Sequence, residues 1–186
     1  MCRPHLRSRG SLMKMLYLLR HAKSSWKDEH LDDFERPLNK RGRAAAAVMG
    51  RYLARQQIVP SQVLCSSSKR TRETWSFLQE AFGTEAVPVR FEKGVYMAEP
   101  IALLRRVRRL DDSLVSVMVI GHNPGLELLA LSLVAEGEQD LRGRLATKFP
   151  TGTLAVLEAE IDAWTDLRPG CCRLLDFVRA RDLVKT

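Results

Sequence analysis

Signals for strands and helices alternate along almost the whole chain, and this alternation limits the fold more than any other feature of the sequence. Met15–Leu19 is a continuous apolar run, as expected of a strand covered on both faces, and Leu114–Ile120 is rich in β-branched residues. Asn39 can cap a helix over Arg43–Gln56, whose Ala-rich start favours that conformation. In chain order, the remaining signals predict the strand Gln62–Cys65, the helix Lys69–Phe82, the strand Val87–Phe91, the helices Ile101–Leu110 and Leu126–Ala135, and the strands Thr153–Ile161 and Arg173–Val178. Such alternation predicts a three-layer α/β/α sandwich with a mainly parallel central sheet.

The length of the chain is typical of one domain. Its 186 residues can bury a substantial core, and no repeat or Pro/Gly-rich linker divides them. We expect a single domain over residues 14–186, preceded by a disordered basic extension over residues 1–13. No apolar run reaches the roughly 18–20 residues that a membrane span needs, so no membrane partner is expected.

The net charge of +8 is concentrated in two short segments. Four positive charges lie before or at the start of the first strand, and four arginines lie within residues 105–109. Nucleic-acid-binding surfaces usually form a basic stripe with interleaved aromatic residues, and this pattern is absent, so no nucleic-acid partner is expected. A basic surface also favours an anionic substrate.

The cysteines indicate a reducing environment. Cys2, Cys65, Cys171 and Cys172 lack the spacing of a metal site, and the adjacent pair is poorly placed to form a bridge. Free thiols in the cytoplasm are the simplest interpretation, so the predicted location is cytoplasmic.

Three polar motifs directly follow predicted strands. They are Leu-Arg-His-Ala-Lys-Ser at 19–24, Cys-Ser-Ser-Ser-Lys-Arg-Thr-Arg at 65–72 and Gly-His-Asn-Pro-Gly at 121–125. In open α/β sheets, ligands bind beyond the carboxyl ends of the strands. We therefore expect an Arg-His pair, an arginine and a second histidine to converge on one crevice; they are Arg20, His21, Arg70 and His122.

Phosphoryl transfer explains this choice of side chains. A transferring phosphoryl group spreads negative charge over its equatorial oxygens, which guanidinium groups bind through charge-assisted hydrogen bonds. A neutral imidazole is a good nucleophile near neutral pH, provided that its other ring nitrogen donates to a fixed acceptor such as a backbone carbonyl. A second imidazole, when protonated, can stabilise the charge of the transition state.

Together the motifs resemble those of the histidine phosphatase superfamily, also called phosphoglycerate mutase-like, and most closely its SixA branch of phosphohistidine phosphatases. The resemblance extends from about Met15 to the C-terminus and implies a phosphoglycerate mutase-like fold. Ala22 stands where the Arg-His-Gly signature usually has glycine, a small change that we expect activity to survive. The segments that carry the resemblance are Leu19–Ser24, Arg36–Gly42, Gly121–Gly125 and Phe149–Thr153, with a late tryptophan and a Pro-Gly turn.

The resemblance implies a role for each residue of the expected crevice. His21 matches the phosphorylated nucleophile and Arg20 a phosphate ligand. The family's second arginine lies a few residues ahead of a threonine after the second strand; Arg70 fits this place, and Arg72 is its rival. His122 matches the second histidine of the pocket.

The general acid is the least defined part of the predicted site. Larger relatives use an acidic residue after the third strand to protonate the leaving oxygen, and Glu92 and Glu99 are the candidates here, although both also fit ordinary surface carboxylates. Phosphohistidine needs less help, because an imidazole leaves easily once protonated. Ser24 and Ser25 are further candidates for hydrogen bonds to phosphate.

These features predict a metal-independent phosphatase that works through a phosphohistidine intermediate and needs no cofactor. The expected partner is a phosphorylated substrate, in particular a protein carrying phosphohistidine, because short connections leave the predicted pocket open. A small-molecule phosphomonoesterase of the same superfamily is one alternative. A non-catalytic phosphate-binding interaction module is the alternative from another class. The sequence carries no indication of the oligomeric state.

Overall fold

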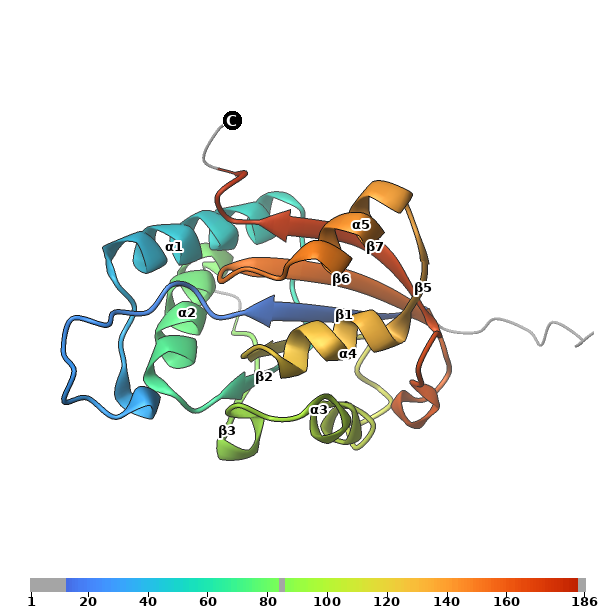
Figure 1. The fold of residues 1–186 in the computed structure, drawn as a ribbon. Coiled ribbons are helices and arrows are strands. Elements are labelled where there is room, and N and C mark those ends of the chain that lie inside the picture. The colour runs from blue at the N-terminus through green and yellow to red at the C-terminus, as the bar shows by residue number, and fades with distance from the viewer. Residues whose placement is uncertain (1–12, 84–85, 184–186) are drawn as a thin grey trace, which may run out of the picture.

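A single mixed sheet forms the centre of the computed structural model, which describes residues 13–83 and 86–183 (Figure 1). Within this part of the chain the sheet has seven strands in the order β3-β2-β4-β1-β6-β7-β5. The strands are β1 (Met13–Arg20), β2 (Gln62–Ser66), β3 (Val89–Glu92), β4 (Ser116–Gly121), β5 (Val134–Gly137), β6 (Thr153–Glu160) and β7 (Cys172–Arg179). The predicted disorder over residues 1–13 falls outside the described residues except at Met13, which is already the first residue of β1.

Most strand pairs are parallel, as predicted. β1 pairs in parallel with β4, β4 with β2, and β2 with β3, whereas β6 runs antiparallel to both β1 and β7. The two late strands, β6 and β7, therefore lie beside each other as consecutive antiparallel strands. Because β1 lies between β4 and β6, the residues that follow it emerge near the middle of the sheet.

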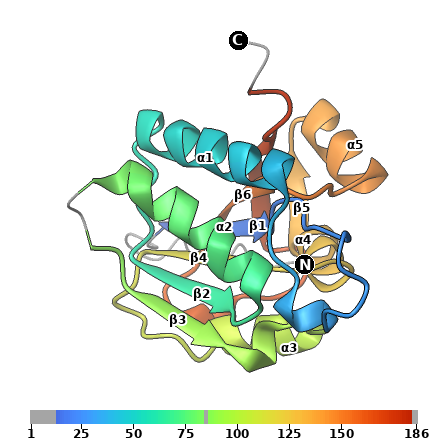
Figure 2. The same ribbon diagram turned by 90° about the vertical axis from the view of Figure 1, so that its left-hand side faces the viewer.

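Helices cover both faces of the sheet and give the predicted three-layer sandwich (Figures 1 and 2). Alternate residues of β1 serve the two faces: Leu16 and Leu18 belong to one buried cluster, and Tyr17 and Leu19 to the other. The helices are α1 (Lys40–Arg55) and α2 (Lys69–Gln79) on one face, and α3 (Pro100–Val107), α4 (Gly125–Leu133) and α5 (Gln139–Thr147) on the other. Short 3-10 turns lie at Asp33–Glu35, Glu80–Phe82, Lys93–Val95 and Trp164–Asp166.

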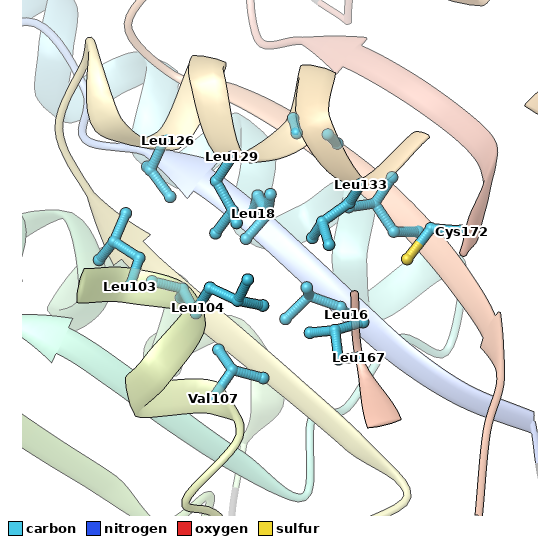
Figure 3. Packing of buried hydrophobic residues seen from close by; sticks show 14 of the residues in the cluster. Leu16, Leu18, Leu103, Leu104, Val107, Leu126, Leu129, Leu133, Leu167 and Cys172 are labelled. Atoms are coloured by element: carbon cyan, nitrogen blue, oxygen red, sulfur yellow. The ribbon is translucent and has the colours of Figure 1, made fainter. Parts of the chain in front are cut away.

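The face covered by α3 and α4 shows how the sequence pattern becomes packing. Leucines from both helices point toward Leu16 and Leu18 of β1 (Figure 3). On α3 the three-residue spacing of Ile101, Leu104 and Val107 predicts one buried face. The buried side chains are Leu103, Leu104 and Val107, whereas Ile101 is 51% exposed. α3 turns Ile101 away from the sheet, and Leu103 takes part in the core in its place.

Two further expectations need correction. On α1 the pattern predicts a buried face made by Val48, Tyr52 and Leu53. The fully buried side chains are Ala46, Met49 and Leu53, while Val48 and Tyr52 are only half-buried. The predicted helix Leu126–Ala135 ends at Leu133, since the chain continues as β5, which pairs with β7. None of the described helices combines the length and the apolar character needed to cross a lipid bilayer.

Candidate active site

The nucleophile predicted from the sequence follows β1 directly and lies in a fixed orientation. His21 is buried, and its Nδ1 lies 2.7 Å from the carbonyl oxygen of Ala22. A carbonyl only accepts hydrogen bonds, so Nδ1 carries the ring hydrogen and donates it. The lone pair is therefore on Nε2, which is the tautomer that a nucleophilic imidazole requires.

The backbone around His21 is bonded to three distant parts of the chain. The amide of His21 donates to the carbonyl of Gly121 at the end of β4, and the amide of Ala22 donates to Thr74 Oγ1 on α2. The amide of Gly152 lies 3.1 Å from the carbonyl oxygen of Arg20 and 3.0 Å from that of His21. These hydrogen bonds fix the backbone of His21 relative to β4, to α2 and to the segment that precedes β6.

His122 lies against His21, with 5.0 Å between the ring centroids. Its Nδ1 is 3.3 Å from Nη2 of Arg70, and its Nε2 is 2.9 Å from Oγ of Ser66. A guanidinium only donates, so Nδ1 of His122 is the acceptor and Nε2 carries the hydrogen. Ser66 had no assigned role in the sequence, although it lies in the second of the three polar motifs.

The first turn of α2 brings Arg70 to His21 and His122, and these three side chains form one cluster with Arg20. Arg70 is 4% exposed, and besides His122 it contacts Asp33, with Nη2 at 2.9 Å from Oδ2 and Nη1 donating to the Asp33 carbonyl. The neighbouring Thr74 donates to the carbonyl of Arg70 at 2.6 Å, which links it to the Ala22 amide described above. The structure thus places Arg70, and not its rival Arg72, beside His122.

Arg20 approaches from the end of β1. Its Nη1 donates to the carbonyl of Phe149 at 2.7 Å, while its buried Nε has no hydrogen-bond partner among the described residues. A buried N–H donor without a partner is costly unless a ligand accepts from it. The segment that begins at Phe149 therefore positions Arg20 through Phe149 and the backbone of the nucleophile through Gly152.

Comparison with known proteins places this arrangement in a family. A family model described as Histidine phosphatase superfamily (branch 1) matches residues 16–95. An uncharacterized protein of Mycobacterium tuberculosis (strain H37Rv) is 34% identical over 161 residues, which cover 86% of this chain and 98% of that protein. A structure of a candidate SixA phosphohistidine phosphatase from Agrobacterium tumefaciens is 31% identical with a TM-score of 0.75, covering 89% of this chain and 97% of that one.

The chain belongs to the histidine phosphatase superfamily. Its similarity to the Agrobacterium protein, and to a second candidate SixA from Nakamurella multipartitia at 26% identity and a TM-score of 0.78, places it in the SixA-type branch. The second match covers 90% of this chain and 96% of that one. The protein is accordingly a phosphatase with the phosphoglycerate mutase-like fold, and a purely non-catalytic module is set aside.

The acidic residues singled out in the sequence do not join the cluster in this phosphatase. Glu92 ends β3, and its carboxylate pairs with Nε of Arg106 at 3.3 Å. Glu99 precedes α3 and contributes its backbone carbonyl to the first turn of that helix. The carboxylate that contacts the cluster is Asp33, which the sequence analysis did not identify; its only signal is a position three residues ahead of the Arg-Pro-Leu segment at 36–38.

Ser24 and Ser25 support the loop of the phosphatase rather than its cluster. The carbonyl of Ser24 accepts from Asn39, and the amide of Ser25 donates to the carbonyl of Pro37. The hydroxyl of Ser25 accepts from the amide of Lys27. Within the described chain, no hydrogen bond joins either serine to the histidines or the arginines of the cluster.

Both His21 and His122 are neutral near pH 7. Burial lowers the pKa of His21 from 6.5 to about 4, with Arg70 and Arg20 acting in the same direction against the hydrogen bond to Ala22. Burial, then the neighbouring His21 and Arg70, lower the pKa of His122 to about 2. His122 can therefore act as a cation only when a bound anion raises its pKa.

The buried neutral state of His21 makes the folded protein sensitive to acid. Between pH 6.5 and about 4 the unfolded chain binds a proton that folded His21 does not, so the free energy of unfolding falls as the pH falls through this range. The pKa difference corresponds to ~3 kcal/mol. We expect urea unfolding at pH 7.0 and 4.5 to show a smaller loss of stability for His21→Gln than for the wild type. The exposed-residue variant His30→Gln should match the wild type, and equal pH dependence in all three proteins would contradict the assigned protonation state.

Proposed function

We propose that this phosphatase removes the phosphoryl group from phosphohistidine side chains of proteins through a covalent intermediate on His21. The observation that carries the proposal is the hydrogen bond from Nδ1 of His21 to the Ala22 carbonyl, which leaves the Nε2 lone pair free beside Arg70 and His122. The SixA-type relatives support phosphohistidine as the substrate class. No metal or cofactor is part of the proposal, and the proposed location is cytoplasmic.

The proposed reaction has two displacement steps. Nε2 of His21 forms a bond to phosphorus while the bond from phosphorus to the substrate imidazole breaks. The leaving nitrogen keeps the electron pair, and the imidazole departs neutral because its other ring nitrogen already carries a proton. Water then attacks phosphorus, the bond to His21 breaks, and inorganic phosphate is released. Arg20, Arg70 and His122 stabilise the charge on the phosphoryl oxygens in both steps.

The contacts of the acidic residues favour a phosphoramidate over an ester. An ester with a poor leaving group needs a proton donor at the leaving oxygen, whereas Glu92 is paired with Arg106. An imidazole leaves easily once it is protonated. In addition, a cavity of about 460 Å³ adjoins the cluster at Tyr96, whose ring packs against His122, and it offers space for a substrate side chain; it is lined by Asp32, Phe34, Glu35, Lys93 and Tyr96.

A substrate comparison tests the proposal. We expect a phosphohistidine protein to be dephosphorylated with a kcat/KM at least ~100-fold higher than that for a panel of sugar and nucleotide phosphates, which is about 2.7 kcal/mol of selectivity. Acid quenching during turnover should trap a labelled phosphoenzyme. A reversed preference would instead support the small-molecule phosphomonoesterase, particularly if Glu92→Gln slowed only esters with poor leaving groups.

A further inference from the structure

Outside the cluster, Asp33 is the residue that accepts hydrogen bonds from the Arg70 guanidinium. Its carboxylate lies 2.9 Å from Nη2 of Arg70, and its backbone carbonyl accepts from Nη1. Two acceptors from one residue therefore face the two terminal nitrogens of the guanidinium. A buried guanidinium needs such partners, since an unpaired charge in the protein interior is strongly unfavourable.

The Asp33 carboxylate is itself held in place. The hydroxyl of Tyr96 donates to Oδ2 of Asp33 at 2.7 Å, and the ring of Phe34 packs edge-on against Tyr96 with 4.9 Å between centroids. The Tyr96 ring also packs edge-on against His122 at 5.2 Å. A chain of contacts thus runs from His122 through Tyr96 to Asp33 and back to Arg70.

The charge state of Asp33 suits an acceptor and not a proton donor. Burial alone would raise the pKa of Asp33, but the hydrogen bonds from Tyr96 and Arg70 outweigh it and hold the pKa below its ordinary value of 3.8. Burial and the Asp33 carboxylate raise the pKa of Tyr96, so the phenol keeps its hydrogen and donates it. Asp33 is therefore ionised at neutral pH, which argues against a general-acid role.

We infer that Asp33 is a positioning residue that acts through Arg70 and orients its guanidinium toward the phosphoryl group, with the Tyr96 hydroxyl holding the Asp33 carboxylate. The inference rests on the proposed function of Arg70 as a phosphoryl ligand. With Nη2 also 3.3 Å from His122, the contacts on both sides fix the plane of the guanidinium. Displacement of such a group by about 1 Å can cost about 100-fold in rate.

A double-mutant cycle on purified full-length protein tests this inference with p-nitrophenyl phosphate as the probe. We expect Asp33→Ala to lower kcat/KM by about 100-fold and Asp33→Asn by about 10-fold, because the amide oxygen still accepts from Arg70 but carries no charge. The double variant Asp33→Ala/Arg70→Ala should match Arg70→Ala within about 3-fold, since a residue that acts only through Arg70 has no effect without it. The acidic limb of the pH profile of Asp33→Ala should move to lower pH, because the Asp33 carboxylate raises the pKa of His21 and of His122.

A neighbouring residue provides a matched control. Asp28 lies in the same loop and accepts from the amide of His30 at 3.1 Å, so Asp28→Ala perturbs that loop without removing the contact to Arg70. It should keep kcat/KM within about 2-fold of the wild type. Loss of activity in Asp28→Ala comparable to that in Asp33→Ala, or a full Asp33→Ala effect in the Arg70→Ala background, would overturn the inference.

The cycle separates failure of this inference from failure of the proposed function. If His21→Ala and Arg70→Ala are inactive while Asp33→Ala is as active as the wild type, only the role of Asp33 is wrong. If Arg70→Ala retains full activity, the proposed function of the cluster fails first. Thermal unfolding of every variant confirms that the measured rates belong to folded protein.

Discussion

Replacement of His21 by alanine is expected to abolish phosphoenzyme formation and to reduce kcat/KM by about 10⁴-fold, because the variant has no atom that can attack phosphorus. The neutral imidazole with its free Nε2 lone pair is the nucleophile of the first proposed step, and its tautomer is fixed by the hydrogen bond to the Ala22 carbonyl. The cationic pocket would remain, so inorganic phosphate should still bind. The measurements are single-turnover kinetics, acid-quench trapping and phosphate titration.

His30→Ala is the control for the His21 prediction. His30 is exposed in the loop that follows β1, and its removal should leave turnover unchanged. Retention of more than about a tenth of wild-type activity by His21→Ala would refute the nucleophile assignment, since a lost covalent route costs several orders of magnitude.

The second large effect is expected for stability, at Gly42 in the first turn of α1. A Cβ atom at this position would lie 2.1 Å from the carbonyl oxygen of Lys23, which also accepts from the amide of Asn39. The atoms that this Cβ would meet are all backbone atoms of Lys23, so relief requires α1 to move away from the segment that follows His21. We expect Gly42→Ala to lower the free energy of unfolding by about 3 kcal/mol and to reduce activity as well.

Gly143 in α5 provides the opposite case of the same substitution. A Cβ atom there meets nothing within 4 Å, so Gly143→Ala should raise the free energy of unfolding by about 0.5–1 kcal/mol through the lower entropy of the unfolded chain. Urea unfolding of both variants measures the difference. Similar stabilities for the two variants would show that the contact between α1 and Lys23 relaxes without cost.

The sequence predicted the layers, the central strands and the four cluster residues because each leaves a local signal. A run such as Met15–Leu19 is apolar on both faces, and Asn39 does cap α1 by accepting from the Gly42 amide at 2.8 Å. The ends of parallel strands coincide in space, so residues that follow β1, β2 and β4 had to approach one another. Their catalytic roles remain proposals.

The parts that the sequence analysis missed depend on contacts between distant segments. α5 buries only Leu145 fully, and β5 gains its conformation from pairing with β7, so neither shows a clear apolar period. Asp33 lies in a polar loop that looks like any exposed turn until Arg70 and Tyr96 are placed beside it. The position of Glu92 after the third strand suits a general acid, but its pairing with Arg106 depends on the fold and leaves no signal in the sequence.

The bonds that tie the backbone of Arg20, His21 and Ala22 to Gly121, Gly152 and Thr74 have a consequence for motion in this molecule. A local fluctuation cannot release the nucleophile, since its amide is paired to the neighbouring central strand and its carbonyl to the segment before β6. Native-state hydrogen exchange at the amide of His21 should therefore proceed only through cooperative opening of the sheet.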